Sequence, residues 1–104
     1  MVSADVFSAL ASPVRRSLLT MLAERSHTVN ELAAEFDMRR PSVSEHLRVL
    51  KDAGLVREHR DGRYRIYTIE PRPLREVADW LRPFERFWRE RMRALAELLD
   101  DEAK

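Results

Sequence analysis

The sequence contains no cysteine, so it can form neither a disulfide bond nor a metal site built on thiolates. It also lacks any apolar run as long as a membrane span or a signal peptide. A hydrophobic content of 44% beside 36% charged residues is typical of a globular chain. We therefore expect one soluble, cytoplasmic domain that spans residues 1–104 and has no membrane partner.

Sequence motifs for catalysis are missing as well. The serines and histidines form no nucleophile elbow, no phosphate-binding loop occurs, and the carboxylates match ordinary surface composition. The histidines, His27, His46 and His59, are too scattered in sequence for a conventional zinc or nickel site. We expect no metal, no cofactor and no enzymatic activity.

The total charge of +1 hides an uneven distribution along the chain. Residues 39–65 contain eight Lys and Arg against four Asp and Glu, which gives this stretch a local charge of +4. Because neutralising phosphates dominates nucleic-acid affinity, a local excess matters more than the total. The stretch is therefore a candidate for nucleic-acid binding, with a solvated surface as the alternative interpretation.

The other elements are arranged around the segment from Arg39 to Gly54. Pro41 suits the first turn of a helix and Gly54 suits the left-handed residue that ends one, which predicts a helix over about 40–53. Its apolar residues recur at helical spacing and form one buried stripe: Val43, Leu47 and Leu50. The opposite side carries Arg, Ser, Glu and Lys, which suit either the DNA major groove or solvent.

Three shorter helices are predicted before this segment. Residues 4–10 favour a helix with Ser3 as its cap, and residues 12–13 (Ser-Pro) are the cap and first-turn pair of a second. Residues 28–31 (TVNE) match a capping box and predict a third. Residues 37–39 then form a connection of the length expected between the helices of a helix-turn-helix.

A β-hairpin is predicted over residues 55–69. Asp61-Gly62 between two extended runs, 55–60 and 63–69, is the strongest short-range signal for such a hairpin. The elements together predict a winged helix-turn-helix, which is mainly α with a small antiparallel β-hairpin. Its core would lie in residues 5–70.

A long C-terminal helix follows Pro71 and Pro73. Its apolar seam exceeds what so small a domain can cover, which predicts a dimerisation helix over residues 73–100. The alternative packs the whole seam back on its own domain. Pro83 should kink or split the helix near Asp79.

Candidate dimer-interface residues combine this seam with one aromatic residue of the first helix: Phe7, Leu74, Val77, Leu81, Phe84, Trp88, Met92 and Leu95. The aromatic residues Phe84, Phe87 and Trp88 could also enclose a small apolar effector between subunits. Dimer packing explains the same residues without any ligand.

Candidate DNA contacts fall into two groups. The base-reading candidates lie on the predicted helix over 40–53: Arg40, Ser42, Ser44, Glu45 and His46. The phosphate or wing candidates are the surrounding arginines: Arg39, Arg48, Arg60 and Arg63. Arg15 and Arg16, on the second helix, are predicted to be surface charges or further phosphate contacts.

Several runs of the sequence together resemble the ArsR family of bacterial winged-helix repressors. LASPVRRSLLTML and TVNELAAEFDMRRPSVSEHLRVLKDAGLVREHRDGRYRIYTI carry the resemblance over about residues 5–70, and WLRPFERFWRERM is similar to a subgroup without metal sites. The resemblance implies a homodimer that binds a palindromic operator and represses transcription. It also implies that a ligand or metal often releases the DNA.

The sequence departs from the metal-sensing members of that family. Arsenic- and lead-sensing relatives carry a Cys-x-Cys pair where this chain has Thr28 and Asn30. Zinc- and nickel-sensing relatives place Asp and His ligands on the C-terminal helix, but no histidine follows His59 here. A metal- or small-molecule-responsive sensor would therefore need a non-standard site.

The leading hypothesis is a homodimeric repressor on double-stranded DNA. Two recognition helices would enter successive major grooves about 34 Å apart, which predicts an inverted-repeat operator. One alternative keeps the fold but assigns the basic face to a protein partner, since fold alone does not fix function. A small enzyme is the other alternative, and no motif supports it.

Overall fold

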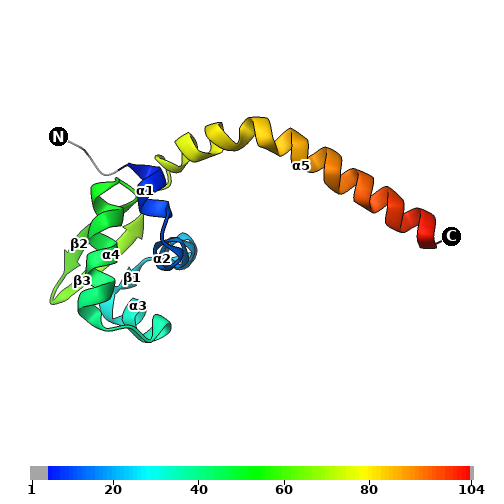
Figure 1. Cartoon of the computed structure of the whole chain (residues 1–104). Helices are drawn as coiled ribbons and strands as arrows, with labels where there is room; N and C mark the ends of the chain where they lie inside the picture. The colour runs from blue at the N-terminus through cyan, green and yellow to red at the C-terminus, as the bar shows by residue number, and fades with distance from the viewer. Residues whose placement is uncertain (1–4, 104) are drawn as a thin grey trace.

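The computed structural model describes residues 5–103. The elements follow the order α1 (Val6–Leu10), α2 (Pro13–Glu24), β1 (His27–Thr28), α3 (Val29–Phe36), α4 (Arg40–Asp52), β2 (Val56–Asp61), β3 (Tyr64–Ile69) and α5 (Leu74–Ala103). The first four helices and the sheet form one body, from which α5 extends as a long arm (Figure 1). The predicted winged helix-turn-helix with a C-terminal helix is confirmed.

Local capping explains where the first helices begin. The predicted cap Ser3 lies outside the described residues, and the capping residue of α1 is Asp5, whose carboxylate accepts the Ser8 N–H at 2.9 Å. Ser12 caps α2 as predicted, with Pro13 in the first turn. The capping box of α3 is also confirmed, because Thr28 accepts the Glu31 N–H and Glu31 accepts the Thr28 N–H.

The hydrophobic core joins the helices to the sheet. Its largest fully buried side chains come from α2, α3, α4 and the residue just before β2: Leu18, Leu22, Leu32, Val43, Leu47, Leu50 and Leu55. Burying each of these stabilises the fold by roughly 2 kcal/mol relative to leaving it exposed. The predicted apolar stripe of α4 is therefore confirmed as part of the core.

The helix-turn-helix consists of α3, a three-residue connection and α4. Asp37 ends α3 in the left-handed conformation (φ 50°), which Asp tolerates better than most residues. Arg39 precedes α4 and provides no side-chain cap, as the sequence indicated. Gly54 ends α4 at φ 78°, where its N–H donates to the Lys51 carbonyl and the Leu55 N–H donates to the Leu50 carbonyl, both at 2.9 Å.

The wing is the antiparallel hairpin of β2 and β3. Asp61 pairs with Tyr64, so the turn residues are Gly62 and Arg63, one position later than the predicted Asp61-Gly62. Gly62 has a φ of 63° and Arg63 does not have a positive φ, which is the pattern of a type II′ turn with glycine first. On its other edge β3 pairs with the two-residue strand β1, which the sequence did not indicate.

Helix α5 is continuous over 30 residues although Pro83 lies inside it. Figure 1 shows the yellow part of the helix bending, so the proline curves α5 without splitting it. Proline causes such bends because it lacks an N–H and its ring crowds the carbonyl four residues earlier. No helix among residues 5–103 has both the length and the apolar character that a membrane span requires.

Most of the α5 seam does not pack on its own domain, so the alternative of complete back-packing is wrong. Leu74 and Val77 pack against the core, and Leu81 is half-buried. Farther along, large apolar residues are exposed, with 52% of Trp88 and 66% of Met92 open to solvent. The arm therefore carries an apolar surface that its own body leaves uncovered.

Replacing Gly54 by alanine should lower the free energy of unfolding by about 1 kcal/mol, because a left-handed φ disfavours any residue with a Cβ. A Cβ there would meet Pro73 Cγ at 3.6 Å, an ordinary contact, so the cost is conformational. Urea unfolding of Gly54→Ala and of Gly54→Asn measures it. The Asn variant should lose less free energy of unfolding than the Ala variant, because Asn adopts a left-handed φ more readily. Equal losses would contradict the conformational explanation.

Candidate nucleic-acid interface

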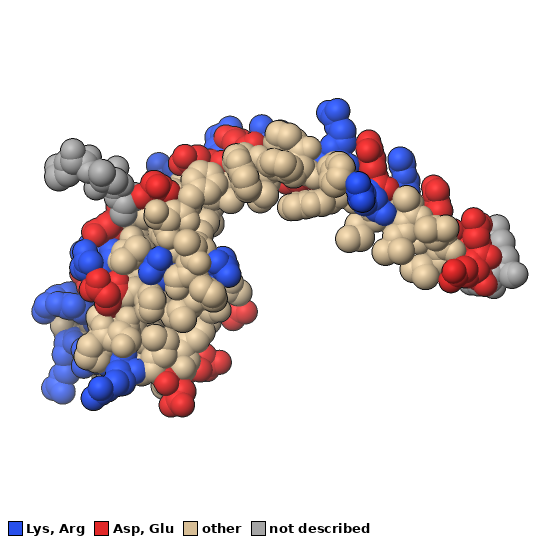
Figure 2. Space-filling model, viewed as in Figure 1, with Lys and Arg blue, Asp and Glu red and all other residues tan. Residues whose placement is uncertain are grey.

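The exposed side of α4 and the wing form one surface rich in arginine. Among the residues predicted to contact DNA, most are exposed: Arg39, Arg40, Ser42, Glu45, Arg48, Arg60 and Arg63. Figure 2 shows Lys and Arg side chains gathered at the lower left, over the wing and the start of α4. We call this region the basic surface.

Several arginines of the basic surface have no carboxylate partner. Within residues 5–103, Arg39, Arg40, Arg60 and Arg63 make no ion pair. By contrast, Arg57, on the other face of the hairpin, lies 3.5 Å from a Glu70 carboxylate oxygen. The positive charge is thus left uncompensated where an external anion can reach it.

Strand pairing places two arginines directly opposite each other near the wing tip. Arg60 of β2 faces Arg65 of β3, and like charges in such a pair destabilise a sheet. Glu58 Oε2 lies 3.7 Å from Arg65 Nη1. A bound anion would relieve this repulsion, so the pairing favours an anionic ligand at the wing.

A groove separates the exposed side of α4 from the inner face of the wing. It is lined by residues of both elements: Pro41, Ser44, Glu45, Arg48, Lys51, Glu58, Arg65 and Tyr67. Lys51 and Arg65 were not among the predicted contacts. Arg65 and the buried Tyr67 are two residues apart in β3, so their side chains lie on the same face of the strand. This spacing is the sequence signal that could have placed Arg65 in the groove.

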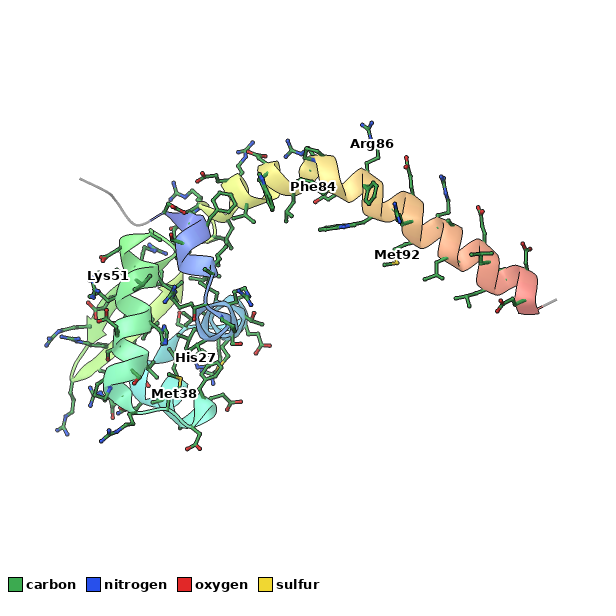
Figure 3. The ribbon with its side chains drawn as sticks, in the orientation of Figure 1. His27, Met38, Lys51, Phe84, Arg86 and Met92 are labelled. Carbon is green, nitrogen blue, oxygen red and sulfur yellow. The ribbon has the colours of Figure 1, made fainter. Side chains whose placement is uncertain are left out.

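Glu58 holds the wing and α4 together inside this groove. Its carboxylate accepts the Tyr67 hydroxyl at 2.7 Å and the Lys51 ammonium at 3.3 Å, and Lys51 lies on α4 beside the hairpin in Figure 3. The Tyr67 hydrogen bond, aided by Lys51 and Arg65 against the effect of burial, lowers the pKa of Glu58. Burial, followed by the bond to Glu58, raises the pKa of Tyr67 to about 12.

A second, smaller cleft lies where the wing meets the starts of α3 and α4. Three of the residues that line it are arginines. The full lining is Thr28, Val29, Asn30, Arg40, Arg63, Tyr64 and Arg65. Arg40 and Arg63, which were predicted as separate base and phosphate contacts, are therefore brought together by the fold.

Glu45 and Arg48 form an ion pair on the exposed side of α4. Arg48 donates to the two Glu45 oxygens at 2.6 and 3.2 Å and also to Asp52 at 3.2 Å. The hydrogen bond from Arg48 lowers the pKa of Glu45, which keeps this carboxylate ionised. Each Glu45 oxygen accepts one of these bonds and keeps a further lone pair, so Glu45 can accept from a base while the pair stays closed.

His46 of α4 lies against α2. It is half-buried, and its Nδ1 lies 3.3 Å from Arg15 Nη1 of α2. Arg15 and Arg16 donate to backbone carbonyls of α1, which gives these arginines a structural role that the sequence did not indicate. This geometry favours a packing role for His46 over a contact with a base or a phosphate.

No metal centre is assembled in the described part of the chain. His27 lies on β1, His46 on α4 and His59 on β2. Among residues 5–103 no three His, Cys, Asp or Glu side chains come together in a way that could hold a metal ion.

Comparison with known proteins shows which family shares this helix-turn-helix and wing. The sequence profile described as "Bacterial regulatory protein, arsR family" matches residues 12–58. The transcriptional repressor SdpR of Bacillus subtilis (strain 168) is 32% identical over 80 residues, covering 77% of this chain and 89% of SdpR. The chain belongs to the arsR family.

Further relatives of this arsR-family protein cover more of its length. The HTH-type transcriptional regulator Rv2034 of Mycobacterium tuberculosis (strain ATCC 25618 / H37Rv) is 38% identical over 96 residues, which span 92% of this chain and 87% of Rv2034. The crystal structure of the ArsR family transcriptional regulator RHA00566 superposes with a TM-score of 0.69 at 42% identity, over 80% of this chain and 91% of that one.

The family assigns the chain to transcriptional regulation and not to catalysis. These relatives are named transcriptional regulators or repressors, so the hypothesis of a small enzyme is set aside. The arsR-family protein carries a DNA-binding helix-turn-helix, and α4 is its second helix.

Replacing Tyr67 by phenylalanine should lower the free energy of unfolding at pH 7 by about 2 kcal/mol, because a buried hydrogen bond to a charged group is lost. The folded-state pKa of Tyr67 is about 12 against an ordinary 10.0. The stability that the hydroxyl contributes is therefore fully present below pH 10 and lost as pH rises to 12.

Denaturant titrations of the wild type and Tyr67→Phe from pH 7 to pH 12 measure the difference in their free energies of unfolding. The stability gap between them should stay constant to pH 10 and close by pH 12. Tyr64→Phe is the control, because Tyr64 is 57% exposed and should show little gap at any pH. A Tyr67 gap that does not change with pH would contradict the assignment.

Proposed function

We propose that the chain acts in the cytoplasm as a homodimeric repressor that binds an inverted-repeat operator in double-stranded DNA. The observation that carries the proposal is the basic surface of uncompensated arginines on α4 and the wing. In a family of DNA-binding regulators, such a surface is the electrostatic signature of phosphate binding. SdpR, which is similar over most of this chain, is named a repressor, which supports repression over activation.

Base reading would fall to the exposed start of α4. Arg40 and Ser42 are exposed there without carboxylate partners, and Ser44 lines the adjacent groove. Arginine in the major groove reads guanine, and serine contacts either kind of base pair. Glu45 would accept from cytosine N4 with the lone pairs that Arg48 leaves free.

Phosphate binding would fall to the arginines around that helix. Arg39 lies just before α4, while Arg60 and Arg63 lie at the wing. Arg65 joins them, because it shares the small cleft with Arg63 and faces Arg60 across the strand pair. The wing would thus grip one strand of the duplex while α4 enters the neighbouring groove.

The arm supports association of two copies. The outer side of α5 is charged and its inner side is apolar (Figure 2); in Figure 3, Arg86 points outward and Met92 points inward. The exposed apolar residues continue from α1 to the end of α5: Phe7, Trp80, Phe84, Phe87, Trp88, Met92, Leu95, Leu98 and Leu99. A contiguous apolar face of this extent marks an interaction surface.

A second copy of the same chain is the partner that best fits this face. Two identical amphipathic helices related by a two-fold axis present the same apolar face to each other. The axis would also relate the two basic surfaces, as an inverted repeat requires. Of the predicted interface residues, Leu74 and Val77 are partly taken up by their own core, so the contact would centre on Leu81, Phe84, Trp88, Met92 and Leu95.

DNA discrimination tests the proposed function. Fluorescence anisotropy would measure binding of the protein to a duplex from immediately upstream of its own coding sequence and to a scrambled duplex of equal composition. A clear preference for the upstream duplex is expected. Equal affinities would favour the alternative in which the basic surface serves a protein partner.

Replacing Arg63 by alanine should weaken binding to all duplexes and reduce the slope of log K against log salt by about one unit, because one phosphate contact is lost. Anisotropy titrations at several salt concentrations measure the slope. Arg57→Ala is the matched control, since Arg57 lies in the same hairpin but pairs with Glu70. An unchanged slope for Arg63→Ala would count against a phosphate contact at this residue.

Replacing Met92 by glutamate should convert the dimer to monomers, because a carboxylate in an apolar interface loses its hydration without gaining a partner. Sedimentation equilibrium of the wild type and the variant measures the change. Arg86→Glu, on the outer side of the same helix, should remain dimeric. A monomeric wild type, or dissociation by both substitutions alike, would refute the arm as the dimer contact.

A further inference from the structure

The small cleft brings together arginines from two separate elements. Arg40 is the first residue of α4, whereas Arg63 lies in the turn of the wing and Arg65 in β3. All three side chains are exposed and line the cleft. Residues 41–62 separate Arg40 from the other two in the chain, so only the folded wing brings the three arginines to one place.

Strand pairing explains why the start of α3 closes the other side of the cleft. Thr28 of β1 pairs with Ile66 of β3, the neighbour of Arg65, and α3 begins at the next residue, Val29. The pairing therefore holds Asn30 beside the arginines of the wing. Asn30 is exposed and lines the cleft together with Thr28, so an amide and a hydroxyl add neutral donors to the charged ones.

Carboxylates leave most of the positive charge of the cleft uncompensated. Within residues 5–103 no acidic residue lines the cleft, and neither Arg40 nor Arg63 makes an ion pair. Arg65 lies 3.7 Å from Glu58, which is longer than a hydrogen bond. The carboxylate of Glu31, in the first turn of α3, is engaged by the capping box. Three cations therefore converge on a space that an anion can enter.

The size of the cleft limits what can bind there. Its volume is about 30 Å³, and it is partly open to solvent. Pockets that enclose whole small molecules are far larger, roughly 300–1,000 Å³. The cleft therefore suits one anionic group, either as part of a larger ligand or as a small ion. A phosphate group fits this description, because its oxygens accept charge-assisted hydrogen bonds from several guanidinium groups at once.

We propose that the small cleft is a binding site for a single phosphate group, which Arg40, Arg63 and Arg65 hold together. This inference rests on the proposed function and refines it, because Arg40 then binds the DNA backbone and does not read a base. The position of the cleft favours a backbone phosphate, since it lies between the start of α4 and the wing, within the basic surface. Inorganic phosphate has the same chemistry and is the other source of such a group.

The sequence dependence of binding separates a phosphate contact of Arg40 from base reading. Arg40→Gln should weaken binding to the upstream duplex and to the scrambled duplex by the same factor, about tenfold, as expected when a hydrogen bond to a charged group is lost. A residue that reads guanine would instead affect mainly the upstream duplex. Fluorescence anisotropy measures both affinities. A loss confined to the upstream duplex would overturn the proposal.

Uncharged phosphate analogues test whether the arginines share one phosphate. Each phosphate of the upstream duplex would be replaced in turn by a methylphosphonate, and binding would be measured for the wild type, Arg40→Gln and Arg63→Gln. At one phosphate in each half-site the replacement should cost the wild type about tenfold in affinity and both variants only about threefold, because each variant has already lost part of that contact.

The identity of the coupled phosphate decides the outcome of this scan. Arg40→Gln and Arg63→Gln should show their smallest penalty at the same phosphate. Arg39→Gln is the matched control, because Arg39 is exposed beside Arg40 but does not line the cleft, so its coupling should fall at another position. Different phosphates for Arg40 and Arg63 would overturn the proposal.

A DNA-free measurement distinguishes the two sources of phosphate. The full-length protein would be titrated with inorganic phosphate, and with sodium chloride at equal ionic strength, while amide NMR follows Asn30, Arg40 and Arg63. A saturable response to phosphate alone, weakened in Arg63→Gln, would show that the site also takes the free ion. No such response beside a shared phosphate in the scan would assign the site to the DNA backbone alone.

The same measurement separates this inference from the proposed function. A saturable response to phosphate together with equal affinities for the upstream and scrambled duplexes would uphold the phosphate site and refute the repressor assignment alone. Equal responses to phosphate and chloride, with no phosphate shared by Arg40 and Arg63 in the scan, would overturn the phosphate site even if the upstream duplex is preferred.

Discussion

The burial of one side of α4 is the constraint on which the rest of the structure depends. Val43, Leu47 and Leu50 have no exposed surface, so the rotation of the helix about its axis is determined by the core. The helical period then decides which side chains remain outside, and these include Arg40, Ser42 and Arg48. The chemistry of the basic surface is thus a consequence of apolar packing on the opposite side.

The wing extends this surface through a contact that is itself part of the fold. Glu58 of β2 binds both Lys51 of α4 and Tyr67 of β3, so the hairpin and the helix are held at a defined separation. The wing tip beyond this contact concentrates arginine although like charges oppose each other there. A bound anion would relieve this repulsion.

Local sequence signals predicted most of the fold. The caps of α2 and α3 and the glycine that ends α4 involve residues three to five positions apart, so they can be recognised without tertiary structure. The strand β1 was missed because two residues carry no periodicity and pair with a strand far along the chain. The hairpin turn was misplaced by one residue, since Asp-Gly suits more than one turn type.

The candidate site was predictable in composition but not in its connections. The excess of arginine in residues 39–65 and the helical spacing of α4 already indicated the exposed, arginine-rich surface that the fold assembles. The partners of Arg15 and His46 were hidden because they are 31 residues apart in sequence and meet only in the folded chain. The ion pair of Glu45 with Arg48 could have been inferred from their helical spacing, because residues three apart lie on the same side of a helix.

The proposed function joins the arm and the basic surface in one symmetric dimer on duplex DNA. Hydroxyl-radical footprinting of the protein on its own upstream DNA tests this claim most directly. A symmetric dimer should protect two segments related by a two-fold axis and centred about one helical turn apart, roughly 34 Å along the duplex. A single asymmetric footprint, or uniform protection that does not follow an inverted repeat, would contradict it.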